Sequence, residues 1–481
     1  MTPLDDLVIG IDAGTSSVKT GILTLRGQLL ALESEAYGLS SPEEGAMEQD
    51  GEAWWSALVT TLRRALARVE TRERPIAVAI GGQAPTFIAV DARMRPLSPA
   101  ITWLDQRPSS VADRIYARLG EEVPIWGSWP AEAAWFACAR PEAQRRTRWY
   151  LGCPDYLVAR LTQTPSFCYW ISAGEIDAAE LDRSLVAPYV EPGTVVGLVH
   201  ESAAEAGLPV GTPVVAASVD GIMGLLGSGA REPGDACMNG GTSGTFSTIC
   251  RPPLGFTLLG LRIIGGGAVN TSGKALDWFA HQVAPLGPRD LGELINEAAA
   301  VPAGSDGLLF LPHLAGERSP VRDANARAAW VGLTLRHDRR HMLRAVLEGV
   351  AFSFRALQRT VESAGAEVRD IRSVGGQARS DVWNQIKADV LARSILVPEV
   401  VEASVTGAAI LAARGVGAFG SDEEAVANMV RMSRRLEPDA ERSAMYAEMF
   451  EMYCGLYPAL KATNWRLHDL ASPRTPVASA V

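Results

Sequence analysis

Two stretches of the sequence have the residues of a phosphate-binding turn, and they match each other. Residues 11–19 are IDAGTSSVK, and residues 238–246 are MNGGTSGTF. The shared Gly-Thr-Ser tripeptides are Gly14, Thr15 and Ser16 in the first stretch and Gly241, Thr242 and Ser243 in the second. Two residues before each tripeptide, the first stretch has Asp12 and the second has Asn239. The chain therefore repeats one turn, with an acid in the first copy and an amide in the second.

This composition suits the oxygens of a phosphate. A hairpin whose tip is Gly-Thr-Ser presents consecutive backbone N–H groups and hydroxyls, which form an anion-binding nest. Asp12 can hold Mg²⁺ directly or through water, whereas Asn239 adds no second negative charge beside a phosphate. A single Gly-Thr-Ser turn also occurs between strands without any ligand. Two copies at domain-scale spacing favour a polyphosphate that is held by both domains.

A third candidate is Asp220, at the end of the apolar stretch TPVVAASVDG (212–221). A carboxylate at the end of a buried strand, followed by Gly221, is rigidly held and open to a ligand. Such a group can accept the proton of a hydroxyl during phosphoryl transfer. The alternative is that Asp220 caps the helix that follows, because Asp before Gly is a common N-cap.

Other motifs for phosphates or metals do not fit. The sequence has no G-x-x-x-x-G-K-[ST] loop, and GVGAFG (415–420) follows an expected helix instead of a strand. We interpret that stretch as a helix stop. His337 and His341 are four residues apart but lack the carboxylate of a zinc motif, so we expect them at the start of a helix.

These residues must be positioned by alternating strands and amphipathic helices, which predicts an α/β fold. Strands are expected at 7–11, 17–24, 76–82 and 212–221, and a helix at 51–69. The first Gly-Thr-Ser then lies in a hairpin. The sequence REPGD (231–235) is the best domain boundary, because Pro and Gly interrupt the pattern there. We expect domains at 1–232 and 233–465 and a flexible tail at 466–481.

Composition excludes several classes of protein. With 47% hydrophobic and 21% charged residues among 481, the chain is typical of globular proteins with more than one domain. A net charge of −10 and the single basic run RRTR (145–148) disfavour a nucleic-acid partner. No apolar run reaches the ~20 residues of a membrane span. The start has no cationic leader, and the six cysteines include no C-x-x-C pair, so we expect a cytoplasmic protein.

Longer segments resemble the FGGY carbohydrate kinases, which belong to the actin-like ATPase superfamily. The most specific segment is AAWVGLTLRHDRRHMLRAVLE (328–348). Supporting segments lie at 309–320, 374–395 and 406–417, and the segments at 47–55 and 99–107 look most like those of xylulokinases. The chain departs from the family pattern around WPAEAAWFACA (129–139), where Glu132 stands near the position of the usual Lys.

The resemblance implies a duplicated two-domain fold of the actin-like, ribonuclease H-like type, with the active site in an inter-domain cleft. It implies an ATP- and Mg²⁺-dependent kinase that phosphorylates a small carbohydrate, with a ketopentose such as D-xylulose as the first candidate. Another polyol or a sugar acid such as gluconate is the alternative. An actin-like ATPase without a sugar substrate and a sugar-binding regulator without turnover are further alternatives. A homodimer is one candidate assembly.

The resemblance also assigns roles to residues. Asp12 would organise Mg²⁺, Asp220 would be the catalytic base, and both Gly-Thr-Ser turns would bind the phosphates. The nucleotide would further be approached by five residues: Gly273, Asp277, Gly375, Gly376 and Ser380. The sugar would be faced by Gln83, Trp103, Asp105 and Asp220.

The acceptor pocket departs from xylulokinases at Ala84 and Pro85. Xylulokinases have Gly-Gln-Met-His where this chain has Gly-Gln-Ala-Pro (82–85). Ala opens volume, and Pro removes both an imidazole and a backbone N–H. We therefore expect measurable but inefficient turnover of D-xylulose, with a better acceptor elsewhere among ketoses, alditols or sugar acids. The alternative is that a neighbouring loop supplies the missing contacts and the enzyme is a plain xylulokinase.

Overall fold

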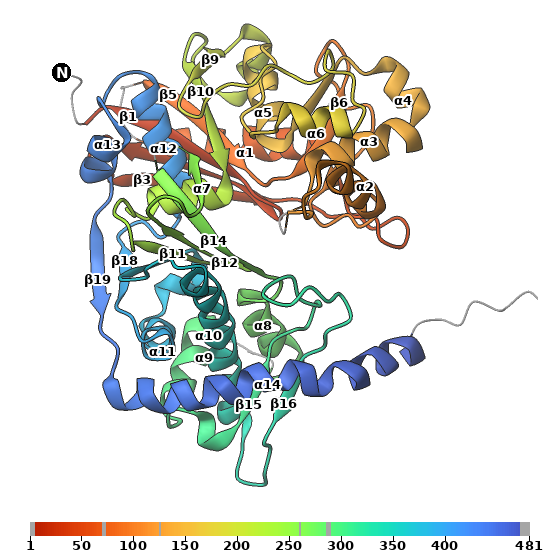
Figure 1. Ribbon diagram of the computed structural model, residues 1–481. Helices are drawn as coiled ribbons and strands as arrows, with labels where there is room; N and C mark the ends of the chain where they lie inside the picture. Colours follow the sequence, from red (N-terminus) through yellow and green to blue (C-terminus); the bar gives the residue numbers. More distant parts are fainter. Residues whose placement is uncertain (1–4, 70–73, 125–126, 259–260, 285–289, 472–481) are drawn as a thin grey trace, which may run out of the picture. The chain divides into compact units, whose positions relative to one another are not determined.

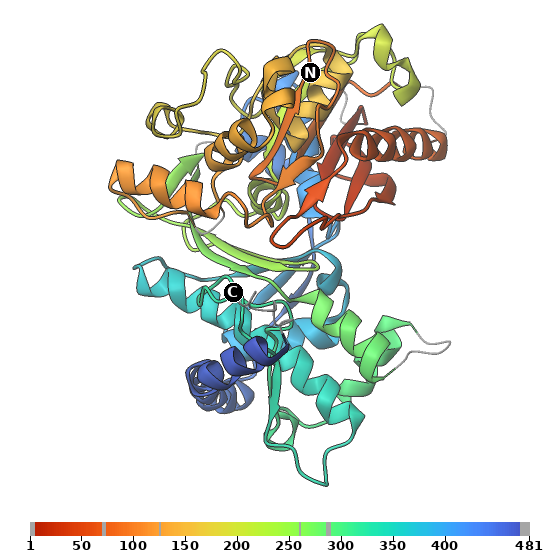
Figure 2. The same cartoon turned by 90° about the vertical axis from the view of Figure 1, so that its right-hand side faces the viewer.

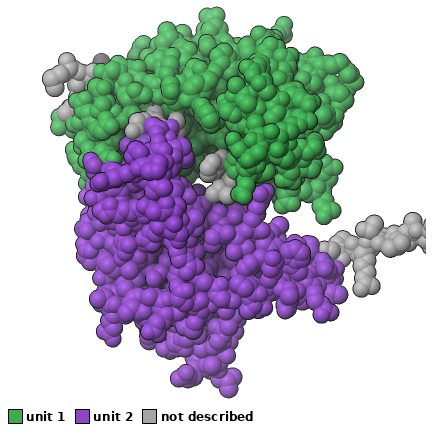
Figure 3. All heavy atoms as spheres, in the orientation of Figure 1, with its two compact units in different colours: residues 1–231, 398–431 green, residues 232–397, 432–481 purple. Residues whose placement is uncertain are grey.

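The computed structural model describes residues 5–69, 74–124, 127–258, 261–284 and 290–471. The chain divides into two compact units, which Figure 3 colours separately. Unit 1 contains residues 1–231 and 398–431, and unit 2 contains residues 232–397 and 432–481. Each unit is an α/β structure built on its own mixed sheet (Figure 1).

The main sheet of unit 1 has six strands in the order β3-β2-β1-β5-β10-β9. They are β1 (Leu7–Ala13), β2 (Ser17–Thr24), β3 (Leu29–Ala36), β5 (Ala77–Gly82), β9 (Val195–Leu198) and β10 (Pro213–Val219). Strands β1, β2 and β3 pair antiparallel, while β5 pairs parallel with both β1 and β10. The expected strands at 7–11, 17–24 and 76–82 are therefore present, with ends shifted by two residues at most.

The main sheet of unit 2 has seven strands in the order β13-β14-β12-β11-β17-β18-β19. They are β11 (Ala236–Gly240), β12 (Gly244–Ile249), β13 (Phe256–Leu258), β14 (Leu261–Val269), β17 (Ile371–Val374), β18 (Ile395–Pro398) and β19 (Met432–Leu436). Strands β14, β12 and β11 pair antiparallel, and β17 pairs parallel with β11 and β18. This repeats the arrangement β3-β2-β1-β5-β10 of unit 1. The fold is duplicated, as the resemblance implied.

A smaller sheet in unit 1 supports a helical layer. Its strand order is β4-β7-β6-β8, with β4 (Glu48–Gln49), β6 (Thr86–Val90), β7 (Ala100–Thr102) and β8 (Trp149–Gly152). The helices nearby are α2 (Ser109–Leu119), α3 (Trp129–Ala139), α4 (Pro141–Arg146), α5 (Cys153–Thr162) and α6 (Ala173–Ala178). The rings of Trp129, Phe136 and Tyr150 surround Phe87, with centroids 5.1–5.6 Å from it. This apolar cluster fixes α3 on the small sheet.

Helices that are distant in sequence cover the main sheet of unit 1. They are α1 (Gly51–Arg68), α7 (Asp220–Gly227) and α12 (Ala403–Gly415), together with α5, while η1 (Glu201–Ala206) packs on α1 and α5 and α13 (Asp422–Met429) packs on α12. Helix α1 packs against β2 and β3 (Figure 2). Helix α12 packs so tightly on β1 and α7 that a Cβ at Gly10 would lie 2.0 Å from the Val405 carbonyl oxygen. A Cβ at Gly227 would likewise lie 1.9 Å from the Ala403 carbonyl oxygen, so both contacts require glycine.

Unit 2 has both single-turn and long helices around its sheet. They are α8 (Gly273–Trp278), η2 (Phe279–Val283), α9 (Leu291–Ala299), α10 (Arg339–Ser363), η4 (Gly376–Arg379), α11 (Asp381–Leu391) and α14 (Ala440–Ala471), with η3 (Ser305–Gly307) and the ladder β15 (Leu309–Leu311) and β16 (Ala329–Val331). Asp338 caps α10, and His341 lies in its first turn, as predicted for the two histidines. Among the described helices, none has the length and apolar composition needed to cross a bilayer.

The expected domain boundaries need two corrections. The first division falls at Arg231/Glu232, beside the expected end of the first domain at 232. Residues 398–431, however, belong to unit 1, so the range 233–465 is not one continuous domain. The expected flexible tail at 466–481 is helical as far as Ala471, because α14 continues there. Residues 472–481 lie outside the described residues.

Candidate active site

The first Gly-Thr-Ser turn joins β1 to β2, as predicted. Ala13 and Val18 are the last paired residues of the hairpin, and the Gly14 N–H donates to the Ser17 carbonyl oxygen at 3.1 Å. The Tyr37 hydroxyl donates to the Gly14 carbonyl oxygen. Ser16 is exposed at the tip. Hydrogen bonds at Gly14 thus fix the base of the turn, while Ser16 at its tip stays exposed. A phosphate nest requires this arrangement.

Two side chains hold Thr15 in this turn. The Gln49 amide donates to the Thr15 carbonyl oxygen at 2.7 Å, and the Trp103 indole N–H donates to the Thr15 hydroxyl at 2.9 Å. The structure therefore joins a residue expected at the phosphates to one expected at the sugar. Gln49 lies in the segment at 47–55, but the sequence does not predict its role. The residues next to it do not indicate which polar side chain of this segment points inward.

Asp12 lies on β1, opposite Lys19 on β2 and Gly81 on β5. Its Oδ1 atom is buried and accepts no hydrogen bond from the described residues. Burial, and then the charge of nearby Asp220, raise the pKa of Asp12 to about 7, while the charge of Lys19 partly opposes this shift. A buried carboxylate oxygen without a partner fits a hard cation, which would relieve both effects.

Asp220 is the first residue of α7 and directly follows β10. The N-cap position belongs to Val219, and no side chain caps this helix. The Asp220 Oδ1 accepts from the Gly221 N–H at 2.7 Å, and the Asp220 carbonyl oxygen accepts from the Ser404 hydroxyl at 3.1 Å. Asp220 is therefore not the helix cap of the alternative interpretation. Strands β1 and β10, both neighbours of β5, bring it near Asp12.

The residues expected to face the sugar differ in burial and in their hydrogen-bond partners. Gln83 is only 1% exposed, and its amide donates to Gln49 Oε1 at 2.8 Å. The side chain of Asp105 is fully buried, and it accepts from the Met47 N–H at 2.9 Å and from the Arg107 guanidinium at 2.7 Å. Both side chains are thus engaged inside unit 1. Trp103 is half-buried.

A small pocket lies next to Gln83. Gln83, Ala84, Pro85 and Thr86 line one part, and the remaining lining residues are Trp129, Gly152, Pro154, Asp155, Phe167, Cys168, Tyr169 and Val219. Ala84 and Pro85 give this wall no polar side chain. The pocket also reaches Val219, the neighbour of Asp220 in the chain. The pocket lies beside the residues expected to face the sugar, but its space of about 10 Å³ is the size of one water molecule and not of a sugar.

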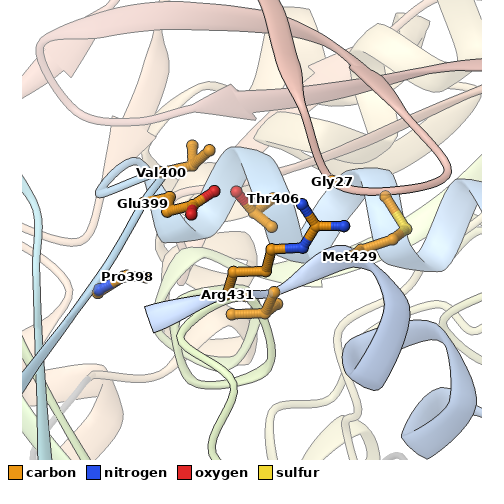
Figure 4. A pocket seen from close by; sticks show the side chains of 9 residues that line it. Gly27, Pro398, Glu399, Val400, Thr406, Met429 and Arg431 are labelled. Atoms are coloured by element: carbon orange, nitrogen blue, oxygen red, sulfur yellow. The ribbon is translucent and has the colours of Figure 1, made fainter. Parts of the chain in front are cut away.

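A second small pocket of unit 1 contains none of the expected site residues. It is lined by Gly27, Gly227, Pro398, Glu399, Val400, Thr406, Met429, Val430 and Arg431. Figure 4 shows the Glu399 and Thr406 side chains pointing toward one another, while Arg431 extends toward Met429. This pocket is separate from the pocket beside Gln83, because the two share no lining residue.

In unit 2, the second Gly-Thr-Ser turn joins β11 to β12 and meets the start of α8. The Gly273 N–H donates to the Gly241 carbonyl oxygen at 2.9 Å, and the Lys274 N–H donates to the Thr242 carbonyl oxygen at 3.2 Å. The Ser243 carbonyl oxygen accepts from the Gly241 N–H at 3.1 Å. Asp277, one turn further along α8, is exposed.

The loop after β17 completes this group. The Gln377 amide donates to the Ser272 hydroxyl at 2.6 Å and to the Gly241 carbonyl oxygen at 3.4 Å. Gly375 has φ +80°, and Gly376 faces open space. The Ser380 hydroxyl caps α11 by accepting from the Trp383 N–H at 3.2 Å. The structure thus brings together three segments that the sequence assigned to the nucleotide, and it adds Gln377, which lies in the recognised segment at 374–395.

Comparisons with known proteins agree with this geometry. Residues 7–175 match the N-terminal domain, and residues 261–416 the C-terminal domain, of the FGGY family of carbohydrate kinases. The chain is 30% identical to a gluconokinase of Bacillus subtilis, over 96% of this chain and 98% of the relative. It belongs to the FGGY family of carbohydrate kinases. A xylulose kinase of Bacillus subtilis is 28% identical to this FGGY kinase over the same shares.

Solved structures support the fold of this FGGY kinase. A xylulose kinase from Rhodospirillum rubrum superposes with a TM-score of 0.80 and 29% identity, over 95% of this chain and 99% of that one. A ligand-bound xylulose kinase from Lactobacillus acidophilus superposes with a TM-score of 0.83 at 23% identity, over 96% and 100% of the two chains. The predicted two-domain α/β fold and the predicted kinase family are confirmed. Kinases of this family use ATP as the phosphoryl donor.

Proposed function

We propose that this kinase transfers the γ-phosphoryl group of ATP to a hydroxyl of a ketopentose, with D-xylulose as the first candidate. The observation that carries the proposal is the placement of Asp220 at the end of β10, within electrostatic reach of Asp12 beside the first turn. A proton acceptor, a metal-binding acid and a phosphate nest are the groups that phosphoryl transfer requires. Relatives named xylulose kinase support the acceptor class.

In this proposal Asp220 accepts the proton of the attacking hydroxyl. Sugar hydroxyls are too weakly acidic to ionise at neutral pH, so the proton is transferred as the phosphoryl group moves. The Gly14 to Ser16 turn of unit 1 and the Gly241 to Ser243 turn of unit 2 orient the phosphates through backbone N–H groups and hydroxyls.

Asp12 is the residue proposed to hold Mg²⁺. When bound, Mg²⁺ would neutralise charge on the phosphate oxygens. Mg²⁺ usually takes one or two protein carboxylates together with substrate phosphates and water, so a single acid at this position is enough for the proposal. A cytoplasmic location and a homodimer remain predictions from the sequence.

A second candidate acceptor is a sugar acid, because relatives named gluconokinase are equally similar. Ala84 and Pro85 keep this alternative open, because they stand where xylulokinases have Met and His. ADP production should be measured with purified enzyme, Mg²⁺-ATP and a panel of ketoses, alditols, aldoses and sugar acids. We expect turnover of D-xylulose that is exceeded by another acceptor. If D-xylulose is best by tenfold or more, our interpretation of Ala84 and Pro85 is wrong. If no acceptor raises ADP production, the kinase proposal is wrong.

A further inference from the structure

The carbonyl oxygens of the first Gly-Thr-Ser turn are all bonded to groups outside the turn. The Gly14 carbonyl oxygen accepts from the Tyr37 hydroxyl, and the Ser16 carbonyl oxygen accepts from the Tyr37 N–H at 3.2 Å. The Thr15 carbonyl oxygen accepts from the Gln49 amide at 2.7 Å. Tyr37 and Gln49 lie outside the tripeptide, and the proposed mechanism does not use them.

The N–H groups of the same turn remain available to a ligand. Among the described residues, neither the Thr15 N–H nor the Ser16 N–H has a hydrogen-bond partner. In a trans peptide group the carbonyl oxygen and the N–H of the next residue point in opposite directions. A bond to the Gly14 carbonyl oxygen therefore fixes the direction of the Thr15 N–H, and a bond to the Thr15 carbonyl oxygen fixes that of the Ser16 N–H. An anion-binding nest requires N–H groups with such a fixed direction.

The orientation of the Gln49 amide is set by two donors. Its Oε1 atom accepts from the Trp54 indole N–H at 3.2 Å and from the Gln83 amide at 2.8 Å. An indole N–H can only donate, so the atom that it contacts must be the amide oxygen. The NH₂ group of Gln49 then faces the Thr15 carbonyl oxygen, and the side chain is buried at 2% exposure. Gln49 can therefore act only as a donor to the turn.

Tyr37 is placed beside the turn by the main sheet of unit 1. It directly follows β3, and the pairing of Ala36 with Ser17 on β2 brings it to the end of the hairpin. Burial, and then the neighbouring Cys153 and Asp12, hold the pKa of the Tyr37 hydroxyl well above its usual value. The hydroxyl therefore keeps its proton at physiological pH and stays a hydrogen-bond donor to the turn.

The second turn, in unit 2, meets the same requirement mainly with backbone donors. The Gly241 and Thr242 carbonyl oxygens accept from the N–H groups of residues 272–274, at the start of α8, over 2.9–3.2 Å. Gln377 adds one longer bond of 3.4 Å to the Gly241 carbonyl oxygen. A single side-chain substitution can therefore release a carbonyl oxygen of the first turn, whereas those of the second turn keep their backbone partners.

We propose that Tyr37 and Gln49 are positioning residues that orient the first turn toward a phosphate of ATP. The Tyr37 hydroxyl acts through the Gly14 peptide group on the Thr15 N–H, and Gln49 acts through the Thr15 peptide group on the Ser16 N–H. The inference rests on the proposed function, which assigns a phosphate to this turn. Because both side chains act through the turn, their loss should weaken binding of the phosphates and leave binding of the adenosine unchanged.

Tyr37→Phe tests the inference, because it removes one hydroxyl and keeps the ring. Gln49→Met is the second variant, since it keeps the length of the side chain and removes both hydrogen-bonding atoms. Calorimetry should compare binding of a non-hydrolysable ATP analogue, with Mg²⁺, to binding of adenosine. We expect affinity for the analogue to fall about tenfold in each variant, the effect of one weakened bond to a charged group, and affinity for adenosine to stay within twofold.

Steady-state kinetics give a second measurement. We expect kcat/KM for ATP to fall about tenfold to a hundredfold, since a small misplacement of reacting groups has effects of this size. Tyr189→Phe is the matched control, because Tyr189 is 43% exposed and its hydroxyl bonds Glu191 instead of the turn. Thermal unfolding checks that each variant is folded.

The outcomes separate this inference from the proposed function. Folded variants that keep both analogue affinity and kcat/KM within twofold of wild type would overturn the inference. An equal loss of analogue and adenosine affinity would also overturn it, because it would show a general loosening of the structure. If Tyr37→Phe does not fold, Gln49→Met decides by the same criteria. A wild-type enzyme that produces no ADP with any acceptor would instead count against the proposed function, and the binding comparison would still test Tyr37 and Gln49.

Discussion

The indole N–H of Trp103 donates a hydrogen bond of 2.9 Å to the hydroxyl of Thr15. One residue precedes the Asp105 loop and the other lies in the first phosphate turn, so this bond links the two sides of the proposed site in unit 1. A change at the acceptor side can therefore alter the orientation of the turn.

We predict that Trp103→Phe lowers kcat/KM about fivefold to tenfold, since the change removes one hydrogen bond worth ~1 kcal/mol and keeps an aromatic ring. In a Thr15→Val background the same change should cost less, because the bond is already absent. Steady-state kinetics of the four proteins measure this coupling. Trp170→Phe is the control, since Trp170 is 65% exposed. Additive effects of the two changes would show that the bond does not matter for turnover.

Asp220→Asn should lower kcat by ~10²–10⁴ while nucleotide affinity changes little. The amide keeps the shape of the side chain, and its oxygen can still accept the hydrogen bond from the Gly221 N–H. It cannot accept the proton of the sugar hydroxyl, and the loss of a general base has effects of this size. Rapid-quench kinetics and nucleotide binding measure the two quantities separately. Asp113→Asn, at an exposed position of α2, should leave both unchanged. A kcat within threefold of wild type would remove Asp220 from the role of base.

The raised pKa of Asp12 predicts a pH dependence of stability in the absence of metal. The folded protein holds a proton on Asp12 up to about pH 7, whereas the unfolded chain releases it near 3.8. Since the folded state binds more protons between these values, its stability should fall as pH rises from about 4 to 7. In EDTA at pH 8, Asp12→Asn should be more stable than wild type by about 1–3 kcal/mol.

Thermal or urea unfolding between pH 5 and pH 8 measures this difference. Added Mg²⁺ should stabilise wild type more at pH 8 than at pH 6, because the ion binds the deprotonated carboxylate and the folded state. It should stabilise Asp12→Asn much less. Equal stabilisation of both proteins by Mg²⁺ would mean that the ion binds elsewhere.

Gly375 and Gly376 form a matched pair in unit 2. A Cβ at Gly375 would lie 2.8 Å from the Gly240 carbonyl oxygen at φ +80°, whereas nothing lies within 4 Å of a Cβ at Gly376. Gly375→Ala should therefore destabilise the protein by about 1–3 kcal/mol. Gly376→Ala should leave stability nearly unchanged but raise the KM for ATP severalfold if adenosine lies over it. An unchanged KM in that variant would place the adenosine elsewhere.

Local patterns predicted much of this molecule. The two hairpin turns, the strand that ends before Asp220 and the helix start near His341 depend on nearby residues, through hydrophobic periodicity, turn composition and capping. The side chains of Gln83 and Asp105 were harder to interpret, because Gln83 bonds Gln49 and Asp105 bonds the Met47 N–H, which only the folded chain brings near. Ser380, in contrast, caps a helix through the N–H of a residue three positions away, which is a local pattern. Distant partners also hide Gln49 and Gln377 from sequence patterns.

The return of residues 398–431 to unit 1 also could not be predicted from sequence. Helix α12 has an apolar composition that suits either unit, and its position is decided by close packing on Gly10 and Gly227. Composition and turn residues reveal where a chain can bend, but they do not reveal which distant surface a helix covers.

This return has a consequence for synthesis on the ribosome. Unit 1 is complete only after residue 431 has been made, so its first 231 residues remain without residues 398–431 while all of residues 232–397 are synthesised. During this interval the surfaces of β1 and α7 that α12 covers are open to water, and nascent chains in this state depend on chaperones or on partial structure. Translation that stalls before codon 403 would leave unit 1 incomplete. The first turn, Asp12 and Asp220 would nevertheless all be present in that chain. Unit 2, in contrast, finishes last, with α14.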